Sequence, residues 1–159
     1  MVFLIHMNQE GYVSHLREEF LPKRYSSILR DEPQVKDSPA DVVALIRKGL
    51  PMAEFHALAD WLDTTEEDLA PLLGISRATL HRRKKTGHLE MPESERLVRF
   101  ARLLRRATEV FEKETAARDW LKSPAVAFSG ESPLSFADTE VGAREVEYLL
   151  GRLEHGVFS

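Results

Sequence analysis

A run of basic side chains in residues 77–88 is the clearest candidate for chemistry, because no acidic residue interrupts it. The basic residues are Arg77, Arg82, Arg83, Lys84 and Lys85. Guanidinium and ammonium groups neutralise phosphates, and arginine also donates paired hydrogen bonds to guanine edges. The chemistry predicted for this segment is therefore recognition of nucleic acid. The net charge of −4 does not exclude this interpretation, since phosphate neutralisation is a local effect.

Helical periodicity on both sides of Gly74 predicts a helix-turn-helix that positions the basic segment. The apolar residues of this pattern are Leu69, Leu72, Leu73, Ile75 and Leu80. Glycine allows the positive φ needed in a tight turn, and Ser76 is a typical N-cap for the second helix, which in such motifs enters the DNA major groove. Two residues depart from the ideal. Pro71 lies inside the first helix, and Arg83 falls where such motifs usually turn an apolar side chain inward.

Six residues of the second helix and its cap are expected to contact DNA. They are Ser76, Arg77, Thr79, Arg82, Arg83 and Lys84. We expect Arg77 and Arg82 to bond guanine edges, while Ser76 and Thr79 bond phosphate or base. The alternative is a solvated basic face on an ordinary helical hairpin.

The composition of the 159 residues fits one or two small globular domains, with 43% hydrophobic and 30% charged residues. There is no cysteine, which excludes disulfides, thiolate metal sites and a cysteine nucleophile, and fits a reducing cytoplasm. Residues 1–7 are apolar, but the run is short and lacks a basic leader, so we expect neither a signal peptide nor a membrane span.

Charge and turn residues divide the chain into regions. Residues 76–106 carry 10 basic and 3 acidic side chains, whereas both flanking regions are acidic. The expected regions are an N-terminal arm and linker at 1–40, a helix-turn-helix DNA-binding domain at 41–90 and a C-terminal domain at 91–159. The clear periodicities are all helical, which predicts an all-α fold in which Trp61 belongs to the core.

A long amphipathic helix is expected at residues 93–112. Its five arginines are Arg96, Arg99, Arg102, Arg105 and Arg106. They are candidates for contact with the DNA backbone or with acidic groups of a partner, and the alternative is a solvated face. Shorter helices are expected at 114–121, from Pro133 and at about 139–154, the last with an apolar face.

The C-terminal part, from about residue 93 to 159, resembles the toxin-binding domain of the Xre/MbcA/ParS antitoxin family. The residues that carry the resemblance are Phe111, Ala116, Ala117, Trp120, Leu121, Pro124, Gly130, Pro133, Leu134, Thr139, Gly142, Ala143 and the ending from Leu150 to Val157. The segment from Leu73 to Arg83 is also similar to the Xre-type helix-turn-helix of that family.

The resemblance implies an Xre-type helix-turn-helix domain followed by a small helical toxin-binding domain. It implies a cytoplasmic type II antitoxin that neutralises a RES-domain toxin, which consumes NAD or modifies proteins with ADP-ribose, and that represses its own operon. The implied partners are this toxin, operator DNA and a second copy in a homodimer, with a higher assembly in the toxin complex. The expected toxin contacts are Arg152, Glu154, His155, Val157 and Phe158. We expect the dimer contact in helix 93–112 or in the N-terminal arm.

Catalysis is not predicted by any residue pattern. The six histidines show no metal-ligand spacing, and no nucleophile elbow or glycine-rich phosphate loop is present, so we expect no catalytic residue, metal or cofactor. Two alternatives to the antitoxin hypothesis stay open. One is a stand-alone helix-turn-helix transcription regulator whose C-terminal domain dimerises or senses a ligand, and the other is a toxin-binding protein whose helix-turn-helix only builds the oligomer.

Overall fold

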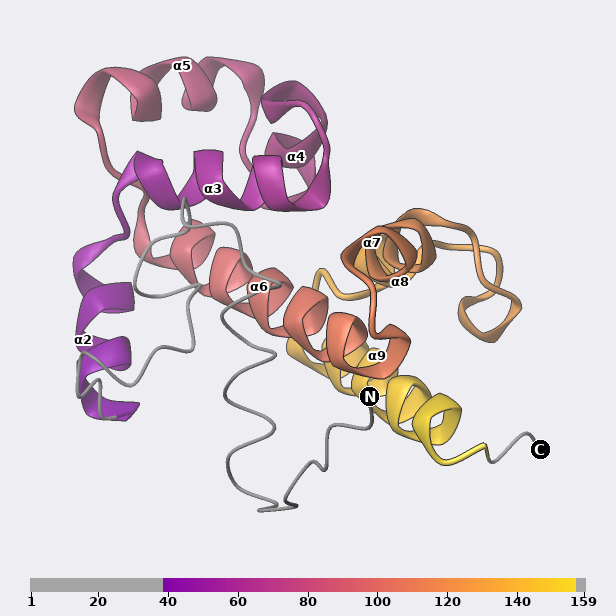
Figure 1. The fold of residues 1–159 in the computed structure, drawn as a ribbon. Coiled ribbons are helices and arrows are strands. Elements are labelled where there is room, and N and C mark those ends of the chain that lie inside the picture. The colour runs from indigo at the N-terminus through magenta and orange to yellow at the C-terminus, as the bar shows by residue number, and fades with distance from the viewer. Residues whose placement is uncertain (1–38, 157–159) are drawn as a thin grey trace, which may run out of the picture.

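The computed structural model describes residues 39–156 and confirms the predicted all-α class (Figure 1). The elements are α2 (Pro39–Lys48), α3 (Met52–Leu62), α4 (Glu66–Leu72), α5 (Arg77–Thr86), α6 (Met91–Phe111), α7 (Glu114–Lys122), the 3₁₀ turn η1 (Val126–Phe128), α8 (Pro133–Phe136) and α9 (Glu140–Glu154). Of the helices in this range, none is long and apolar enough to cross a membrane. Most of the expected N-terminal arm, residues 1–38, lies outside the described part.

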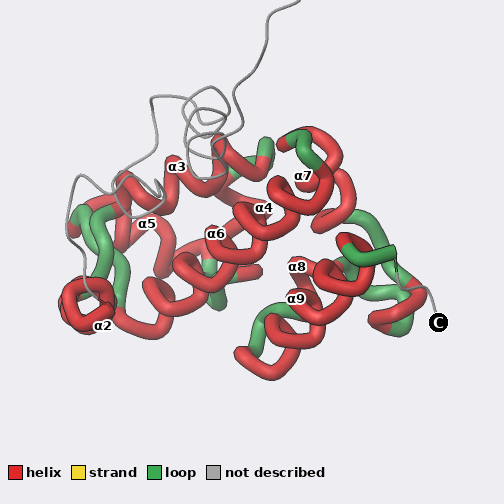
Figure 2. The backbone as a smooth tube through the Cα atoms, turned by 60° about the horizontal axis from the view of Figure 1, so that its bottom comes forward, coloured by secondary structure: helices red, strands yellow, loops and turns green. Residues whose placement is uncertain are grey.

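Helix α6 is the central element of the fold. Helices α2 and α3 pack on it, as do α7 and α9, and Figures 1 and 2 show it passing through the middle of the molecule. Its apolar stripe is buried at Leu97, Phe100, Leu104 and Ala107, inside one hydrophobic core that extends from the α2–α3 loop to α9. The division expected between residues 90 and 91 falls at the start of α6, so the two expected regions share this helix and its core.

The helix-turn-helix has the local geometry that the sequence predicts. The Ser76 hydroxyl accepts a hydrogen bond from the Thr79 amide at 3.2 Å, which confirms the predicted N-cap, and Gly74 has φ +73°. Pro71 lies exposed in the last turn of α4, where its missing amide removes one backbone hydrogen bond of this short helix. Trp61 is buried, as expected for a core residue.

Two loops pair at the base of the helix-turn-helix and hold it to α6. The Met52 amide donates to the Gly87 carbonyl at 2.9 Å, and the Leu89 amide donates to the Leu50 carbonyl at 2.8 Å. The Leu50 amide in turn donates to the buried Ser94 hydroxyl on α6 at 2.9 Å. These bonds satisfy backbone groups that would otherwise be buried without partners.

Gly49 is required where these loops meet. Its φ is +89°, and a Cβ atom built there would lie 2.2 Å from the backbone oxygen of Leu89. A side chain at this position would therefore separate the paired loops. Gly87 has a similar φ of +79° but open space around it, so it provides a matched comparison.

We predict that Gly49→Ala destabilises the protein more than Gly87→Ala. Both variants incur about 1–2 kcal/mol for a left-handed alanine, and Gly49→Ala adds about 1–3 kcal/mol because backbone must move. Urea denaturation followed by circular dichroism measures both free energies of unfolding. Equal losses in the two variants would show that the contact between the loops is not tight.

Candidate DNA and partner interfaces

The exposed side of α5 gathers most of the basic side chains predicted to contact DNA. Arg77 and Arg82 are exposed, and helical geometry places them on the arc opposite the buried Leu80 and Arg83. His81 and Lys85, also exposed, lie between them on the same arc. A helix with cations on one side and apolar contacts on the other can lie against a polyanion without disturbing its own packing.

Ser76 and Thr79 form a small cap network at the start of α5. The Ser76 hydroxyl, which accepts from the Thr79 amide, also donates to the Thr79 hydroxyl at 3.0 Å. Both side chains therefore help to cap the N-terminus of α5. Their position at the N-terminus of α5 also suits phosphate, because helix N-termini favour anions.

Arg83 lies inside the protein, where it pairs with α6. Only 6% of Arg83 and 7% of Glu93 is exposed. The Arg83 Nε donates to both carboxylate oxygens of Glu93, at 2.8 and 3.1 Å, and Nη2 reaches one of them at 3.0 Å. Nη2 also lies 2.7 Å from a Glu90 carboxylate oxygen. Hydrogen bonds to Glu93 raise the pKa of Arg83, so its guanidinium stays charged.

These contacts correct the expectation that Arg83 touches DNA. Its guanidinium is turned inward, as the apolar side chain usual at this position would be, and Glu93 supplies the charge that makes burial tolerable. Glu93 also accepts from the Glu90 amide at 2.7 Å, so it caps α6 at the same time. Arg83 thus positions α5 against α6 rather than facing a ligand.

Lys84 pairs with Glu66 on α4. The other oxygen of Glu66 lies 2.7 Å from the Nδ1 of His56, so three helices meet at one carboxylate. Burial alone would raise the pKa of Glu66, but Lys84 and His56 together lower it. The Lys84 side chain as a whole is still well exposed.

Arg96, on α6, hydrogen-bonds to the turn between α4 and α5. Its Nη1 donates to the Leu73 carbonyl at 3.0 Å, and a Cβ atom on Gly74 would lie 2.0 Å from this same nitrogen. The arginine fills the space that the glycine leaves. A side chain at position 74 would therefore displace the end of Arg96 and this hydrogen bond.

Three arginines of α6 pair with glutamates of α9, which runs parallel to it. Arg99 and Arg102 contact Glu140, Arg102 lies 2.6 Å from Glu147, and Arg106 lies 2.5 Å from Glu154. We call this set of residues the arginine–glutamate ladder. The sequence analysis left these arginines as candidates for contact with DNA, a partner or solvent. In the structure, Arg99, Arg102 and Arg106 instead pair with glutamates of the same chain.

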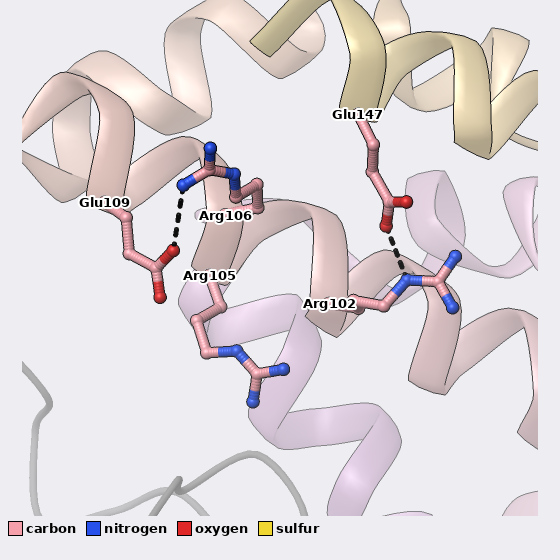
Figure 3. A pocket seen from close by; sticks show the side chains of 5 residues that line it. All are labelled: Arg102, Arg105, Arg106, Glu109 and Glu147. Carbon is pink, nitrogen blue, oxygen red and sulfur yellow. Dashed lines mark hydrogen bonds and ion pairs between the residues drawn. The ribbon is translucent and has the colours of Figure 1, made fainter. Parts of the chain in front are cut away.

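The ladder flanks a shallow groove of about 370 Å³ between α6 and α9. Figure 3 shows its lining residues, which are Arg102, Arg105, Arg106, Glu109 and Glu147. Burial alone would raise the pKa of Glu140, but Arg102 and Arg99 lower it, and the hydrogen bond from Arg106 lowers that of Glu154. Both carboxylates are therefore ionised at neutral pH, and the groove holds cations already matched by anions.

The end of α9 presents the residues predicted to contact a toxin. Arg152 and His155 are exposed, whereas the carboxylate of Glu154 is engaged by Arg106. Val157 and Phe158 lie outside the described residues. The ladder thus fixes the last turn of α9, from which the predicted contact residues continue.

The outer face of α9 carries two exposed apolar residues that the sequence analysis missed. Val141 is 74% exposed and Tyr148 is 65% exposed, and both lie on the same side of the helix as Arg152. The sequence contained a signal for this face. Val141 and Tyr148 are seven residues apart, which places them on the side of the helix opposite Val146 and Leu150. An aromatic and an aliphatic side chain beside an arginine are typical anchors of protein interfaces.

No group of three or more histidine, aspartate or glutamate side chains that could hold a metal ion occurs among residues 39–156. The exposed features of the described residues are the basic side of α5 and the end of α9.

The chain matches two protein families, and the two matched ranges meet within α6. Residues 41–102 match the family described as the antitoxin Xre-like helix-turn-helix domain, and residues 106–156 match the antitoxin Xre/MbcA/ParS C-terminal toxin-binding domain. The chain is 34% identical to an antitoxin Xre of Photorhabdus laumondii over 119 residues, which cover 73% of this chain and 80% of the relative. It is 35% identical to an antitoxin Xre of Yersinia enterocolitica over 120 residues, covering 74% and 81%. A third antitoxin Xre, of Pseudomonas putida, is 35% identical over 68 residues, 43% of each chain.

We predict that Arg83→Met destabilises the fold by about 3–5 kcal/mol, because it leaves the Glu93 carboxylate buried without its partner. Adding Glu93→Gln removes that charge while keeping the acceptor for the Glu90 amide, so the double variant should recover most of the loss. Arg82→Met, at the exposed neighbouring position, should change stability by less than about 0.5 kcal/mol. Chemical denaturation measures all three, and a double variant that is no more stable than Arg83→Met would contradict the pairing.

Proposed function

Because this chain belongs to the antitoxin Xre family, with a helix-turn-helix and a toxin-binding domain, we propose that it neutralises a RES-type toxin and represses its own operon. The family supports the expectation that the chain is not an enzyme. The proposed toxin consumes NAD or transfers ADP-ribose, and the proposed place of action is the cytoplasm. A homodimer and a larger assembly with the toxin complete the proposal.

The observation that carries the proposal is the separation of two exposed surfaces by α6. Helix α5 contacts the first turns of α6 through Arg83 and turns its basic side away from α6, whereas the end of α9 contacts the later turns of α6 through Glu154 (Figure 1). The two surfaces also differ in chemistry, since one is a set of cations and the other combines apolar and charged groups. This arrangement suits a protein that binds DNA at one end and a protein at the other.

For toxin binding, the proposed contacts are Arg152, His155, Val157 and Phe158, with Glu154 next to them. The apolar pair would occupy a cleft of the toxin, while Arg152 and His155 pair around its rim. Glu154 contributes mainly through Arg106, which holds the last turn of α9 in place. Tyr148 extends the proposed contact along the helix.

For DNA binding, the proposed contacts are Ser76, Arg77, Thr79, Arg82 and Lys84. Arg77 and Arg82 would donate to guanine edges, and the Ser76–Thr79 cap would face a phosphate. Arg83 acts indirectly, because its pair with Glu93 sets the orientation of α5.

Co-expression with the neighbouring gene tests whether the chain neutralises a toxin. We predict that neutralisation depends on the residues after Gly156. The full chain should relieve growth arrest by the toxin and co-purify with it. A chain ending at Gly156 keeps all of α9 and the Arg106–Glu154 pair, so it should fold normally yet bind the toxin at least about 100-fold more weakly, as expected on losing an apolar anchor. A chain ending at Gly151 additionally loses the last turn of α9.

The truncations also give the contradicting results. If the chain ending at Gly156 neutralises the toxin as well as the full chain does, then Val157 and Phe158 are not the anchors. A neighbouring product that neither arrests growth nor co-purifies would instead favour a stand-alone transcription regulator.

The DNA part predicts that Arg77→Ala and Arg82→Ala each weaken binding to the operon's own promoter by about 1–3 kcal/mol. Fluorescence anisotropy with a labelled promoter fragment, at several salt concentrations, measures the affinity and its salt slope. Arg144→Ala, which removes an exposed arginine on α9, is the matched control and should leave affinity unchanged. Absence of promoter binding by the wild-type protein, alone and with toxin, at every salt concentration would refute this part.

A further inference from the structure

We propose that Glu66 restrains the affinity of α5 for DNA, because it holds the ammonium group of Lys84 until a phosphate takes its place. This inference rests on the proposed DNA-binding function and adds to it a residue outside α5 that sets how tightly DNA is bound. Toxin binding plays no part in it.

The first argument is that ion pairs engage only some of the cations of α5. Among residues 39–156, Arg83 pairs with Glu93 and Lys84 pairs with Glu66. No ion pair within this range engages the other basic residues of α5, all of them exposed, which are Arg77, Arg82 and Lys85. A phosphate can therefore meet these three cations directly, whereas it must compete with a carboxylate for Lys84.

The second argument is that the structure fixes the Glu66 carboxylate in place. The Thr65 hydroxyl accepts from the Asp68 amide at 3.1 Å, which caps α4 and sets the first turn that carries Glu66. One carboxylate oxygen of Glu66 lies 2.7 Å from Nδ1 of His56 on α3, and the other contacts Nζ of Lys84 on α5. Surface ion pairs are weakened by the entropy of two mobile side chains, and the contact with His56 reduces this loss for Glu66.

The third argument is the position of Lys84 on α5. It follows the buried Leu80 by four residues, so it lies one turn further along the border of the buried face, where α5 packs against α4. A cation at this border is placed for a phosphate rather than for the base edges, and phosphate contacts carry no sequence information. Glu66 therefore changes how tightly DNA is bound without changing which sequence is preferred.

Contact between Lys84 and a phosphate requires an exchange of partners. The new contact releases a counterion from the DNA, but the Glu66 carboxylate that is left behind attracts a cation from solution and repels nearby phosphates. These effects oppose the gain from the contact. The side chains of Lys84 and Glu66 are 42% and 29% exposed, so the pair is weak enough to break, and it changes the affinity by about 2- to 5-fold.

Fluorescence anisotropy on the full chain tests this restraint with the promoter fragment and with an unrelated duplex of equal length, each at several salt concentrations. Glu66→Gln should raise the affinity for both duplexes by the same factor, about 2- to 5-fold, and should steepen the salt slope by about 0.9. Glu67→Gln removes the same charge at the exposed neighbouring position, so it is the matched control and should give the smaller increase.

Removal of Lys84 from two backgrounds isolates the pair. Lys84→Met should lower the affinity at least about 3-fold more in the Glu66→Gln variant than in the wild type, because only the variant offers an unpaired ammonium to the DNA. Lys85→Met, at a neighbouring position that has no ion pair within residues 39–156, should lower the affinity by the same factor in both backgrounds. Circular dichroism checks that each variant keeps its helical content.

Carboxyl titration by nuclear magnetic resonance tests the pair without DNA. Burial raises the pKa of Glu66, and the hydrogen bond from Lys84 is the strongest of the interactions that lower it. Lys84→Met should therefore raise the pKa of Glu66, whereas Lys85→Met should leave that pKa unchanged.

Three results would overturn the proposal. One is an affinity for the unrelated duplex that Glu66→Gln raises no more than Glu67→Gln does, which would leave DNA binding itself intact. Another is a pKa of Glu66 that Lys84→Met does not change. The third is a chain that binds neither duplex at any salt concentration, with or without Glu66→Gln, which would refute the proposed DNA binding as well.

The two duplexes also separate the restraint from repression of the operon. Equal affinity for the promoter fragment and the unrelated duplex would refute repression of its own operon. If Glu66→Gln still raised both affinities by the same factor, that result would support the restraint by Glu66.

Discussion

The buried ion pair between Arg83 and Glu93 is the interaction on which the arrangement of this protein depends. Two charges withdrawn from water are tolerated only with good geometry, and here the guanidinium faces both oxygens of the Glu93 carboxylate while its Nη2 also contacts Glu90. An apolar residue at position 83 would pack against α6 with less directional preference. The ion pair instead fixes the rotation of α5 about its axis, which determines which basic side chains point outward.

The same helix that receives this pair also holds the opposite end of the molecule. The first turns of α6 contact the helix-turn-helix through Glu93, Ser94 and Arg96, whereas its later turns hold α9 through Arg102 and Arg106. The two exposed surfaces are therefore placed relative to each other by one continuous helix and one core. A break in α6 would uncouple them even if each half kept its local structure.

The sequence predicted features that depend on neighbouring residues better than features that depend on packing. The cap at Ser76, the turn at Gly74 and the helix begun at Pro133 follow from local chemistry, and all three are present. The partners of Arg99 and Arg106 lie 41 and 48 residues away, so no window of the sequence contains both members of a pair. Arg83 occupies a position of the motif that usually faces inward, yet it was assigned to DNA because its neighbours are basic and exposed. Only the position of α6 shows that Glu93 is there to pair with it.

The arginine–glutamate ladder also separates two kinds of sequence change. Arg106 and Glu154 must change together, because each is the electrostatic complement of the other within one chain. Tyr148 and Arg152 project from the same helix into solvent, and among residues 39–156 no hydrogen bond or ion pair restricts them in this way. A descendant of this protein can therefore acquire specificity for a different partner by altering the outer face of α9 while inheriting its scaffold unchanged.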